Sequence, residues 1–213
     1  MAPSPLDDRD RSRLLAIADE VIVDELLGRD PIVLDAVPLP AELRAPVGLF
    51  VSLHVRGALN GCIGSIQTNE PLGVSVARHA WSAAFADPRF PSVTWADYED
   101  LDIEISILSP LASAAASARP VLLDALRPGV DGLLIAAGSK QAVFLPVVWE
   151  QLATADEFVS QLFRKAGLSP AAWPSDLRAF VFTTDTFSNR EACALADSGP
   201  ERSSALGLDS ELI

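Results

Sequence analysis

The stretch Gly48-Leu-Phe-Val-Ser-Leu-His-Val-Arg-Gly57, which continues as Ala58-Leu-Asn-Gly-Cys-Ile-Gly-Ser-Ile66, decides the fold. Apolar residues alternate with more polar ones in its first half, which predicts a half-buried β-strand. Gly57 permits a tight reversal of the chain, so we expect residues 59–66 to return as the second arm of a β-hairpin.

The length of the hairpin turn determines which side chains share a face with Cys62. A two-residue loop places Cys62 opposite Val51, whereas a three-residue loop places it opposite Ser52 with His54 on the diagonal. Gly57 in the second loop position favours the shorter turn. We therefore predict that Cys62 faces Val51, and a Cys62–His54 pair is disfavoured.

The same patterns predict the remaining elements. We expect strands at residues 101–107, 132–137, 141–145 and 180–187, the middle two forming a second hairpin. We expect helices at residues 5–27 (capped by Ser4), 71–86 and 154–167, the last from the capping box Thr154-x-x-Glu157. The Ala- and Ser-rich stretch 111–119 is either a surface connector or a short helix. Because strands arrive mostly as hairpins with helices set between them, the fold class is α+β, with a largely antiparallel sheet and flanking helices.

Composition limits the class of protein. The 213 residues hold 16 Lys and Arg against 29 Asp and Glu, a formal net charge of −13. Such an acidic chain lacks the basic surface that nucleic acid or an anionic membrane requires, so we expect neither partner. A hydrophobic fraction of 49% is that of a folded globular protein.

The cysteine content and the N-terminus indicate the compartment. The two cysteines, Cys62 and Cys193, are too few for a disulfide framework or a structural zinc site, so we expect no metal centre. The N-terminal residues lack the basic and apolar regions of a secretory signal, and no apolar stretch is long enough to span a membrane. We expect a cytoplasmic protein.

Cys62 is the first candidate for chemistry. Gly61 and Gly64 leave the backbone around it unshielded, which is typical of a bulge or of the close approach of a ligand. Cys62 can be a nucleophilic or redox thiol, provided that a base or cation nearby favours the thiolate. The alternative is a small residue packed in a sheet, which is the commoner case for a free cysteine.

Four other residues carry alternatives. Glu104 can act as a general base in a cleft, or it can simply face water. Asp87 and Arg89 flank a proline turn and can bind a substrate carboxylate or fix the loop. His79 lies on the apolar side of its expected helix and is interpreted as a packed histidine. The chain has no phosphate-loop, dinucleotide-binding or serine-hydrolase motif.

The string Leu59-Asn-Gly-Cys-Ile-Gly-Ser65 resembles the signature Leu-Arg-Gly-Cys-Ile-Gly of the AMMECR domain family, which includes the "AmmeMemoRadiSam system protein A" proteins. Further segments resemble the family in the same order: residues 87–91 (Asp-Pro-Arg-Phe-Pro), 101–110, 144–149 and 164–168. The resemblance covers roughly residues 14–187. We expect an AMMECR-like domain over residues 5–187, followed by an acidic, mobile tail at residues 188–213.

The resemblance implies a larger lobe, a smaller lobe and a cleft between them near the signature. It also implies association with a Memo-like protein and a radical-SAM protein. The best hypothesis is a cytosolic enzyme, or enzyme subunit, that binds a small molecule or modified residue near Cys62. The alternative is a non-catalytic accessory or adaptor protein for those partners, and the cofactor is unknown.

Seven residues form the expected site. The candidate catalytic residues are Cys62 and Glu104, and the candidate binding residues are Asn60, Gly61, Gly64, Asp87 and Arg89. Asn60 stands where the family usually has Arg, so a charge that would favour the thiolate is missing at that position.

Overall fold

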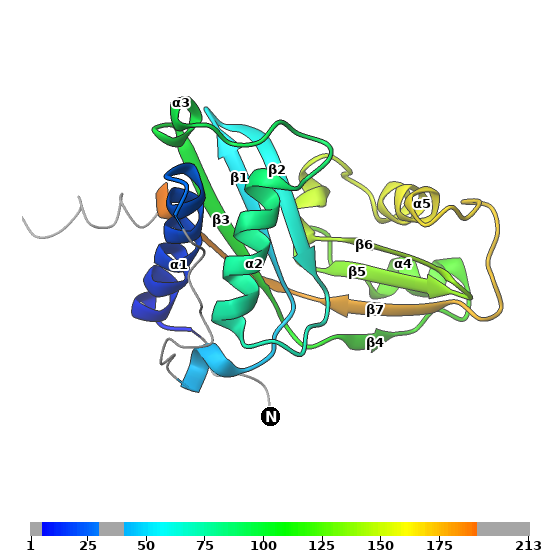
Figure 1. Ribbon diagram of the computed structural model, residues 1–213. Helices are drawn as coiled ribbons and strands as arrows, with labels where there is room; N and C mark the ends of the chain where they lie inside the picture. The colour runs from blue at the N-terminus through cyan, green and yellow to red at the C-terminus, as the bar shows by residue number, and fades with distance from the viewer. Residues whose placement is uncertain (1–5, 30–40, 191–213) are drawn as a thin grey trace, which may run out of the picture.

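The computed structural model describes residues 6–29 and 41–190, and its elements form two lobes (Figure 1). The larger lobe contains α1 (Asp8–Leu26), η2 (Ala41–Arg44), β1 (Leu49–Val55), β2 (Ala58–Ser65), α2 (Leu72–Phe85), α3 (Trp95–Tyr98), β3 (Leu101–Leu108) and β8 (Thr184–Ser188). The smaller lobe contains β4 (Ala112–Ala114), α4 (Arg119–Ala125), β5 (Gly132–Ala137), β6 (Lys140–Phe144), η3 (Pro146–Glu150), α5 (Ala155–Lys165) and β7 (Arg178–Phe182). The predicted α+β class is confirmed.

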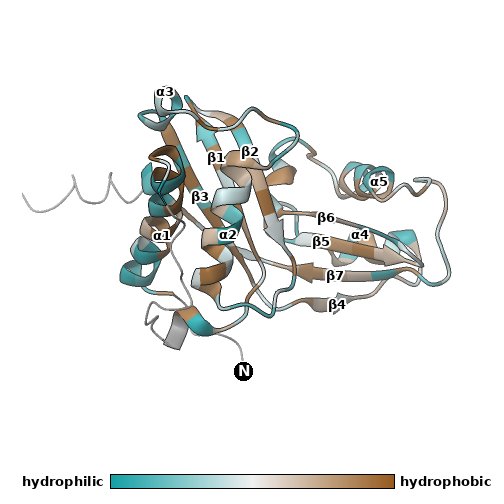
Figure 2. Cartoon of the chain, viewed as in Figure 1, coloured by the Kyte–Doolittle hydropathy of each residue, from teal (hydrophilic) through white to brown (hydrophobic). Residues whose placement is uncertain are grey.

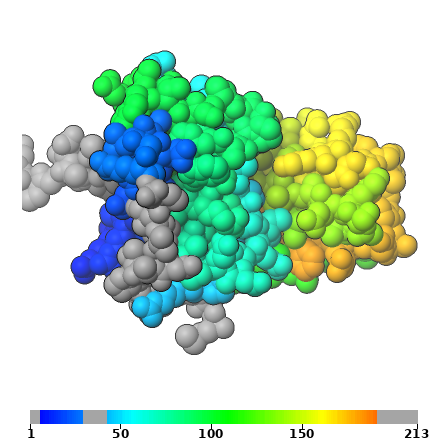
Figure 3. All heavy atoms as spheres, in the orientation of Figure 1, coloured from blue at the N-terminus to red at the C-terminus, as the bar shows by residue number. Residues whose placement is uncertain are grey.

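Each lobe is built on its own four-stranded antiparallel sheet. The strand order is β2-β1-β3-β8 in the larger lobe and β4-β7-β5-β6 in the smaller one. The chain crosses between the sheets twice, and the two crossings are bonded to each other. The Ser109 N–H donates to the Thr183 carbonyl at 2.9 Å, and the Thr183 N–H donates to Ser109 Oγ at 2.9 Å. Figure 3 shows the smaller lobe, coloured mainly yellow and orange, as a distinct body beside the larger lobe.

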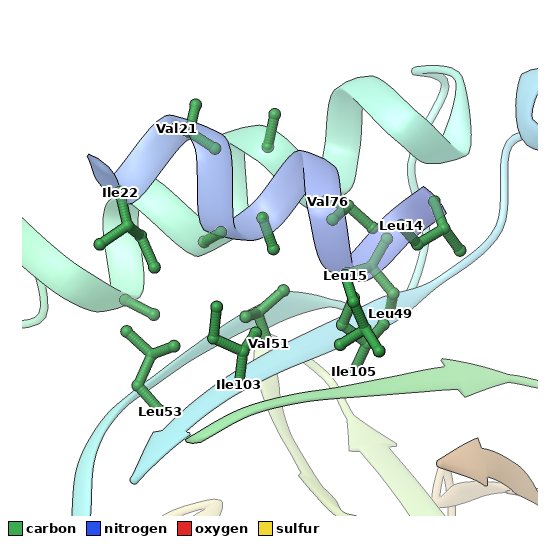
Figure 4. Close-up of a cluster of buried hydrophobic side chains, with 14 of the residues drawn as sticks. Leu14, Leu15, Val21, Ile22, Leu49, Val51, Leu53, Val76, Ile103 and Ile105 are labelled. Atoms are coloured by element: carbon green, nitrogen blue, oxygen red, sulfur yellow. The ribbon is translucent and has the colours of Figure 1, made fainter. Parts of the chain in front are cut away.

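Helices α1 and α2 pack on one face of the larger sheet. Figure 4 shows their apolar side chains directed at β1 and β3, with Ile22 of α1 near Leu53 at one end of the cluster and Leu14 near Leu49 at the other. These four side chains are fully buried. Burial of each aliphatic side chain of this size stabilises the fold by about 1.5–3 kcal/mol. The hydropathy colouring in Figure 2 agrees with this packing, because hydrophobic residues (brown) are frequent in the strands and hydrophilic residues (teal) lie on the outer turns of α1.

The smaller lobe has a separate core dominated by aromatic rings. Trp149 stacks on Phe158 with the ring centroids 3.9 Å apart, and Phe144 meets Phe158 edge-on at 5.3 Å. The indole N–H of Trp149 donates to the carbonyl of Asp131 at 2.7 Å, which satisfies the polar atom of this buried ring. Each lobe therefore has its own hydrophobic core.

The hairpin turn has the predicted length. Val55 pairs with Ala58, so the loop consists of Arg56 and Gly57 alone. Both loop residues have positive φ angles, 53° and 79°, as a tight hairpin turn of this length requires.

A β-bulge follows the turn. His54 pairs with Leu59, but Leu53 pairs with Gly61, so Asn60 is an extra residue on β2. A bulge of this kind bends its strand and reverses the face on which the following residues lie.

The predicted pairing of Cys62 with Val51 is therefore wrong, because the bulge places Cys62 opposite Ser52. Turn chemistry alone does not reveal an extra residue three positions later. Tight packing against α2 accompanies the bulge: a Cβ added at Gly61 would lie 2.1 Å from the carbonyl oxygen of Ala83. Only glycine allows β2 to approach the helix backbone this closely.

Three further parts of the structure differ from the elements that the sequence predicts. The stretch 111–119 contains the short strand β4, which was not predicted, and α4 begins at its end. The single strand predicted at 180–187 is two strands, β7 and β8, in different sheets, because the chain crosses between lobes at Thr183. The short helix α3 was not predicted.

The ends of the helices follow local capping. Glu157 donates its N–H to Thr154 Oγ1 at 3.2 Å, so the predicted start of α5 is confirmed. Helix α1 is capped by Asp7, whose carboxylate accepts from the Asp10 N–H at 2.8 Å. Ser4 and the predicted tail beyond residue 190 lie outside the described residues. Within those residues, no helix combines the length and apolarity that crossing a membrane would demand.

His79 is a buried residue of α2, as the sequence predicts. Its Nδ1 lies 2.7 Å from the carbonyl oxygen of Ser75, so this nitrogen carries the proton in the neutral ring. Burial, together with the charge of Arg78, lowers the pKa of His79 below its ordinary value. The folded protein therefore resists protonation of a histidine that the unfolded chain protonates readily.

We predict that this histidine makes stability fall with acidity. As the pH drops below about 6.5, the unfolded chain binds a proton that folded His79 does not, so unfolding becomes more favourable by up to about 1.4 kcal/mol per pH unit. Urea unfolding between pH 7.5 and 5.5 should show this slope in the wild type and in His54→Gln, and a reduced slope in His79→Gln. An equal slope in all three proteins would contradict the assignment.

Candidate functional site

Cys62 lies on the face of the larger sheet opposite the helices. It is half-buried, and Ser52 of β1 and Glu104 of β3 follow it in one row across the strands. The Ser52 hydroxyl donates to the Cys62 sulfur at 3.4 Å. The thiol therefore contacts a hydroxyl neighbour, and the sulfur is not sealed in the aliphatic core between the sheet and the helices.

Gly64 shapes the surface next to Cys62 on the same face. It pairs with Phe50, and a Cβ at Gly64 would lie 2.4 Å from the Phe50 ring. The ring thus covers the glycine directly. Gly61 faces the helices instead, so the two glycines predicted to bind a ligand have different structural roles.

Asp87 and Arg89 clamp the backbone of Cys62. β2 is an edge strand of its sheet, and at Cys62 its outward N–H donates to Asp87 Oδ2 at 3.0 Å. The Cys62 carbonyl accepts from Arg89 Nη2 at 2.6 Å. The two side chains thus occupy the positions that a neighbouring strand would occupy, which protects the edge of the sheet.

The clamp is held together by an ion pair. Arg89 donates through Nε to Asp87 Oδ1 at 2.9 Å and through Nη2 to Oδ2 at 2.6 Å. The Asp87 side chain is 1% exposed, whereas the Arg89 side chain is 57% exposed. The bonds from Arg89 hold the pKa of Asp87 well below its usual range; burial opposes them, and the Cys62 N–H adds to them. Asp87 is therefore an anion whose hydrogen bonds are directed at the protein, while part of Arg89 faces solvent.

Asn60 links the bulge to the same loop. Its side-chain amide donates to the carbonyl of Pro91 at 3.3 Å. The Asp-Pro-Arg-Phe-Pro segment therefore holds β2 at two points, through Cys62 and through Asn60. Because Arg89 lies against Cys62, it supplies a positive charge near the thiol although Asn60 is uncharged.

Lys165 lies within electrostatic range of Cys62 and Arg89 and was not predicted from the sequence. It is the last residue of α5, in the smaller lobe, and its ammonium donates to the Val143 carbonyl at 3.0 Å. It also lies 5.1 Å from the centroid of the Phe144 ring. Burial lowers the pKa of Lys165, while Cys62 and Arg89 lie close enough to affect it electrostatically, Cys62 raising it and Arg89 lowering it. The segment 164–168 was noted for its family resemblance, which was the available signal.

Glu104 lies one strand further from the thiol. Ser52 separates it from Cys62 in the row, and Ser188 of β8 lies beyond it. His54 is placed two residues along β1, opposite Asp102. The structure thus groups Cys62 with Asn60, Asp87 and Arg89, and sets Glu104 at the edge of this group.

Two surface hollows lie elsewhere. One of about 570 Å³ is in the smaller lobe and is lined in part by Ser117, Trp173 and Arg178. The other, of about 590 Å³, adjoins the crossing between lobes at residues 108–111. Cys62 lines neither of them. In the described part of the chain, no three His, Cys, Asp or Glu side chains are grouped closely enough to hold a metal ion.

We predict that the clamp contributes much more to stability than an exposed ion pair. Asp87→Ala leaves the Cys62 N–H and the Arg89 guanidinium without their acceptor and should lower the free energy of unfolding by about 2–3 kcal/mol. The matched control is Asp100→Ala, which removes the exposed 2.8 Å pair with Arg56 and should cost less than about 1 kcal/mol. Equal losses in urea unfolding would show that Asp87 has no special role.

Comparison with known proteins agrees with this architecture. A family model described as AMMECR1 matches residues 15–187. A protein of Methanothermobacter thermautotrophicus is 33% identical over 193 residues, covering 88% of this chain and 98% of its own. Protein TK0174 of Thermococcus kodakarensis is 35% identical over 161 residues, covering 70% of this chain and 75% of its own.

A solved structure shows the same fold. The crystal structure of protein PH0010 from Pyrococcus horikoshii matches with a TM-score of 0.75 at 29% identity, covering 83% of this chain and 89% of that one. The match to the family model covers the described strands and helices except the first turns of α1 and the last residue of β8. The chain therefore belongs to the AMMECR1 family.

Proposed function

We propose that this protein is an enzyme, or a subunit of one, that binds a small molecule or a modified residue at Cys62, where the two lobes meet. The observation that carries the proposal is the placement of a half-buried thiol beside a clamped arginine whose side chain is 57% exposed. Reactive cysteines occur in partly exposed, electropositive surroundings of this kind.

The backbone geometry supports the same proposal. A thiol nucleophile has to be held in a fixed position, and the clamp fixes both polar backbone groups of Cys62. In this proposal Cys62 is the reacting group. Asp87 and Asn60 position it, Gly64 and Phe50 form the adjoining surface, and Arg89 meets the ligand. Glu104 would act at the far end of a longer ligand.

The proposed partners are a Memo-like protein and a radical-SAM protein in the cytoplasm. These partners follow from the resemblance to the AmmeMemoRadiSam system protein A group. In such an assembly this chain would receive or deliver the molecule on which the partners act.

A non-catalytic accessory protein is the second candidate, and one observation favours it. The hydrogen bond at the Cys62 sulfur comes from the Ser52 hydroxyl, and a hydroxyl is not a general base. In this alternative the lobe junction presents a groove to a partner enzyme, and Cys62 serves only in packing.

We predict that Cys62 is more reactive in the folded protein than in the unfolded chain. In a Cys193→Ser background, iodoacetamide at pH 7 should modify native Cys62 at least about threefold faster than the same chain in urea, because the folded protein holds the sulfur in a partly exposed position beside Arg89. Mass spectrometry of the intact protein measures the rate, and Cys62→Ser gives the blank.

A slower reaction in the folded protein would remove the nucleophile and support the accessory protein. A second experiment then distinguishes the enzyme from the accessory protein. The Cys62→Ala variant is tested for pull-down of the Memo-like and radical-SAM partners and for its effect on their activity. Retained binding with unchanged partner activity fits an accessory role, whereas lost activity with retained binding fits the enzyme.

A further inference from the structure

The hollow of about 570 Å³ in the smaller lobe lies at the edge of the smaller sheet, and Cys62 does not line it. It is formed beside β4, an edge strand of three residues that pairs with β7 (Figure 1). Three stretches of chain line it: residues 113–114 with 116–117, residues 173–175, and residues 177–180. A hollow of this volume is large enough for a small molecule.

Trp173 holds the walls of this hollow in place. Its indole N–H donates to the Ala116 carbonyl at 2.9 Å, so this bond joins two of the three stretches. Its ring stacks on Phe163 of α5, with the ring centroids 5.3 Å apart and the planes 19° apart. The third stretch lies mostly in β7, which is hydrogen-bonded to β4 on one side and to β5 on the other. The hollow is therefore formed before any ligand binds, which lowers the entropic cost of binding.

Arg178, Phe180 and Ser113 project from the same face of the smaller sheet. Arg178 and Phe180 are two residues apart on β7, and Ser113 of β4 is paired with Phe180. Side chains two residues apart on a strand, and those of directly paired residues, lie on one face of a sheet. All three residues line the hollow, so a guanidinium, an aromatic ring and a hydroxyl are neighbours there.

In the described part of the chain, the lining of the hollow carries one positive charge and no negative one. The charge is that of Arg178, although acidic residues outnumber basic ones by 29 to 16 in the sequence. Arg178 is exposed, and within residues 6–29 and 41–190 its guanidinium forms no hydrogen bond or ion pair. Arg119 of the same lobe, by contrast, donates to Asp156 at 2.9 Å. The guanidinium of Arg178 thus keeps all its N–H donors for a ligand, and its planar fork matches carboxylate and phosphate oxygens.

Three serine hydroxyls add further donors to the hollow. Ser113, Ser117 and Ser175 all line it and are exposed, and none of their hydroxyls is hydrogen-bonded to another described residue. The second hollow, at residues 108–111, has no charged side chain among its described lining residues. The combination of a cation, hydroxyls and aromatic rings therefore distinguishes the hollow beside β4.

We propose that this hollow binds a small molecule that carries a carboxylate or phosphate group next to a flat apolar part. The anionic group accepts hydrogen bonds from Arg178 and from the serine hydroxyls, and the apolar part lies against Trp173 and Phe180. The site shares no residue with the group around Cys62, so it is a second site, independent of the proposed function.

Titrations followed by ¹H–¹⁵N NMR test this site with three small aromatic compounds. Phenyl phosphate and phenylacetate are anionic, and phenylacetamide is the neutral counterpart of phenylacetate. The indole N–H of Trp173 is the reporter because it lies in the wall of the hollow, and that of Trp149, in the core of the same lobe, is the internal control. At least one anion should shift the Trp173 signal saturably, with a dissociation constant of about 1 mM, and leave the Trp149 signal in place.

Two arginine variants isolate the charge in the hollow. Arg178→Gln removes a charge-assisted hydrogen bond and should weaken the binding of the anion by at least about tenfold. The matched control is Arg164→Gln, which removes an exposed arginine of α5 that does not line the hollow. It should change the dissociation constant by less than about 1.5-fold.

The outcomes also identify the class of anion. Binding of phenyl phosphate alone indicates a phosphorylated ligand, and binding of phenylacetate alone indicates a carboxylate. Three results would overturn the proposal: no saturable shift at Trp173 with either anion, binding of phenylacetamide as tight as that of the anions, or unchanged affinity in Arg178→Gln. None of these measurements involves Cys62, so their outcome is independent of whether the thiol reacts.

Discussion

The ion pair of Asp87 and Arg89 on the backbone of Cys62 is the interaction on which the candidate site depends. A buried carboxylate is tolerated because it accepts hydrogen bonds from the Cys62 N–H and from the guanidinium. In return it holds the edge of β2, and it fixes the position of the arginine that faces solvent. One pair of side chains thus links the end of α2, the bulged strand and the charge beside the thiol.

The two-lobed architecture determines where Lys165 lies relative to the site. The lobes have separate cores and are connected through two adjacent crossings bonded to each other at Ser109 and Thr183. Lys165 is anchored in the smaller lobe by Val143 and Phe144, so its position relative to Cys62 depends on how the lobes meet.

Alternation of apolar residues was sufficient to predict most strands, and turn chemistry was sufficient for the first hairpin. The face of Cys62 was not predictable in this way, because the bulge at Asn60 reverses it. Two contacts from distant parts of the chain accompany that bulge: Gly61 against Ala83, and Asn60 on Pro91. The alternation of apolar and polar residues also continues through Thr183, where the chain passes from one sheet to the other. The sequence therefore predicted one strand where the structure has two. The relation of Lys165 to Cys62 could not be predicted, because a single lysine at the end of a helix forms no recognisable motif. Its position relative to Cys62 depends on how the two lobes are arranged.

The central claim is that Asp87 holds the outward N–H of an edge strand at Cys62. Amide hydrogen exchange at this one residue, followed by NMR, tests it most directly. The account predicts that the Cys62 N–H is protected in the wild type and exchanges much faster in Asp87→Ala, while the amides of β1 keep their protection. Rapid exchange of Cys62 in the wild type, or unchanged protection in the variant, would contradict the account.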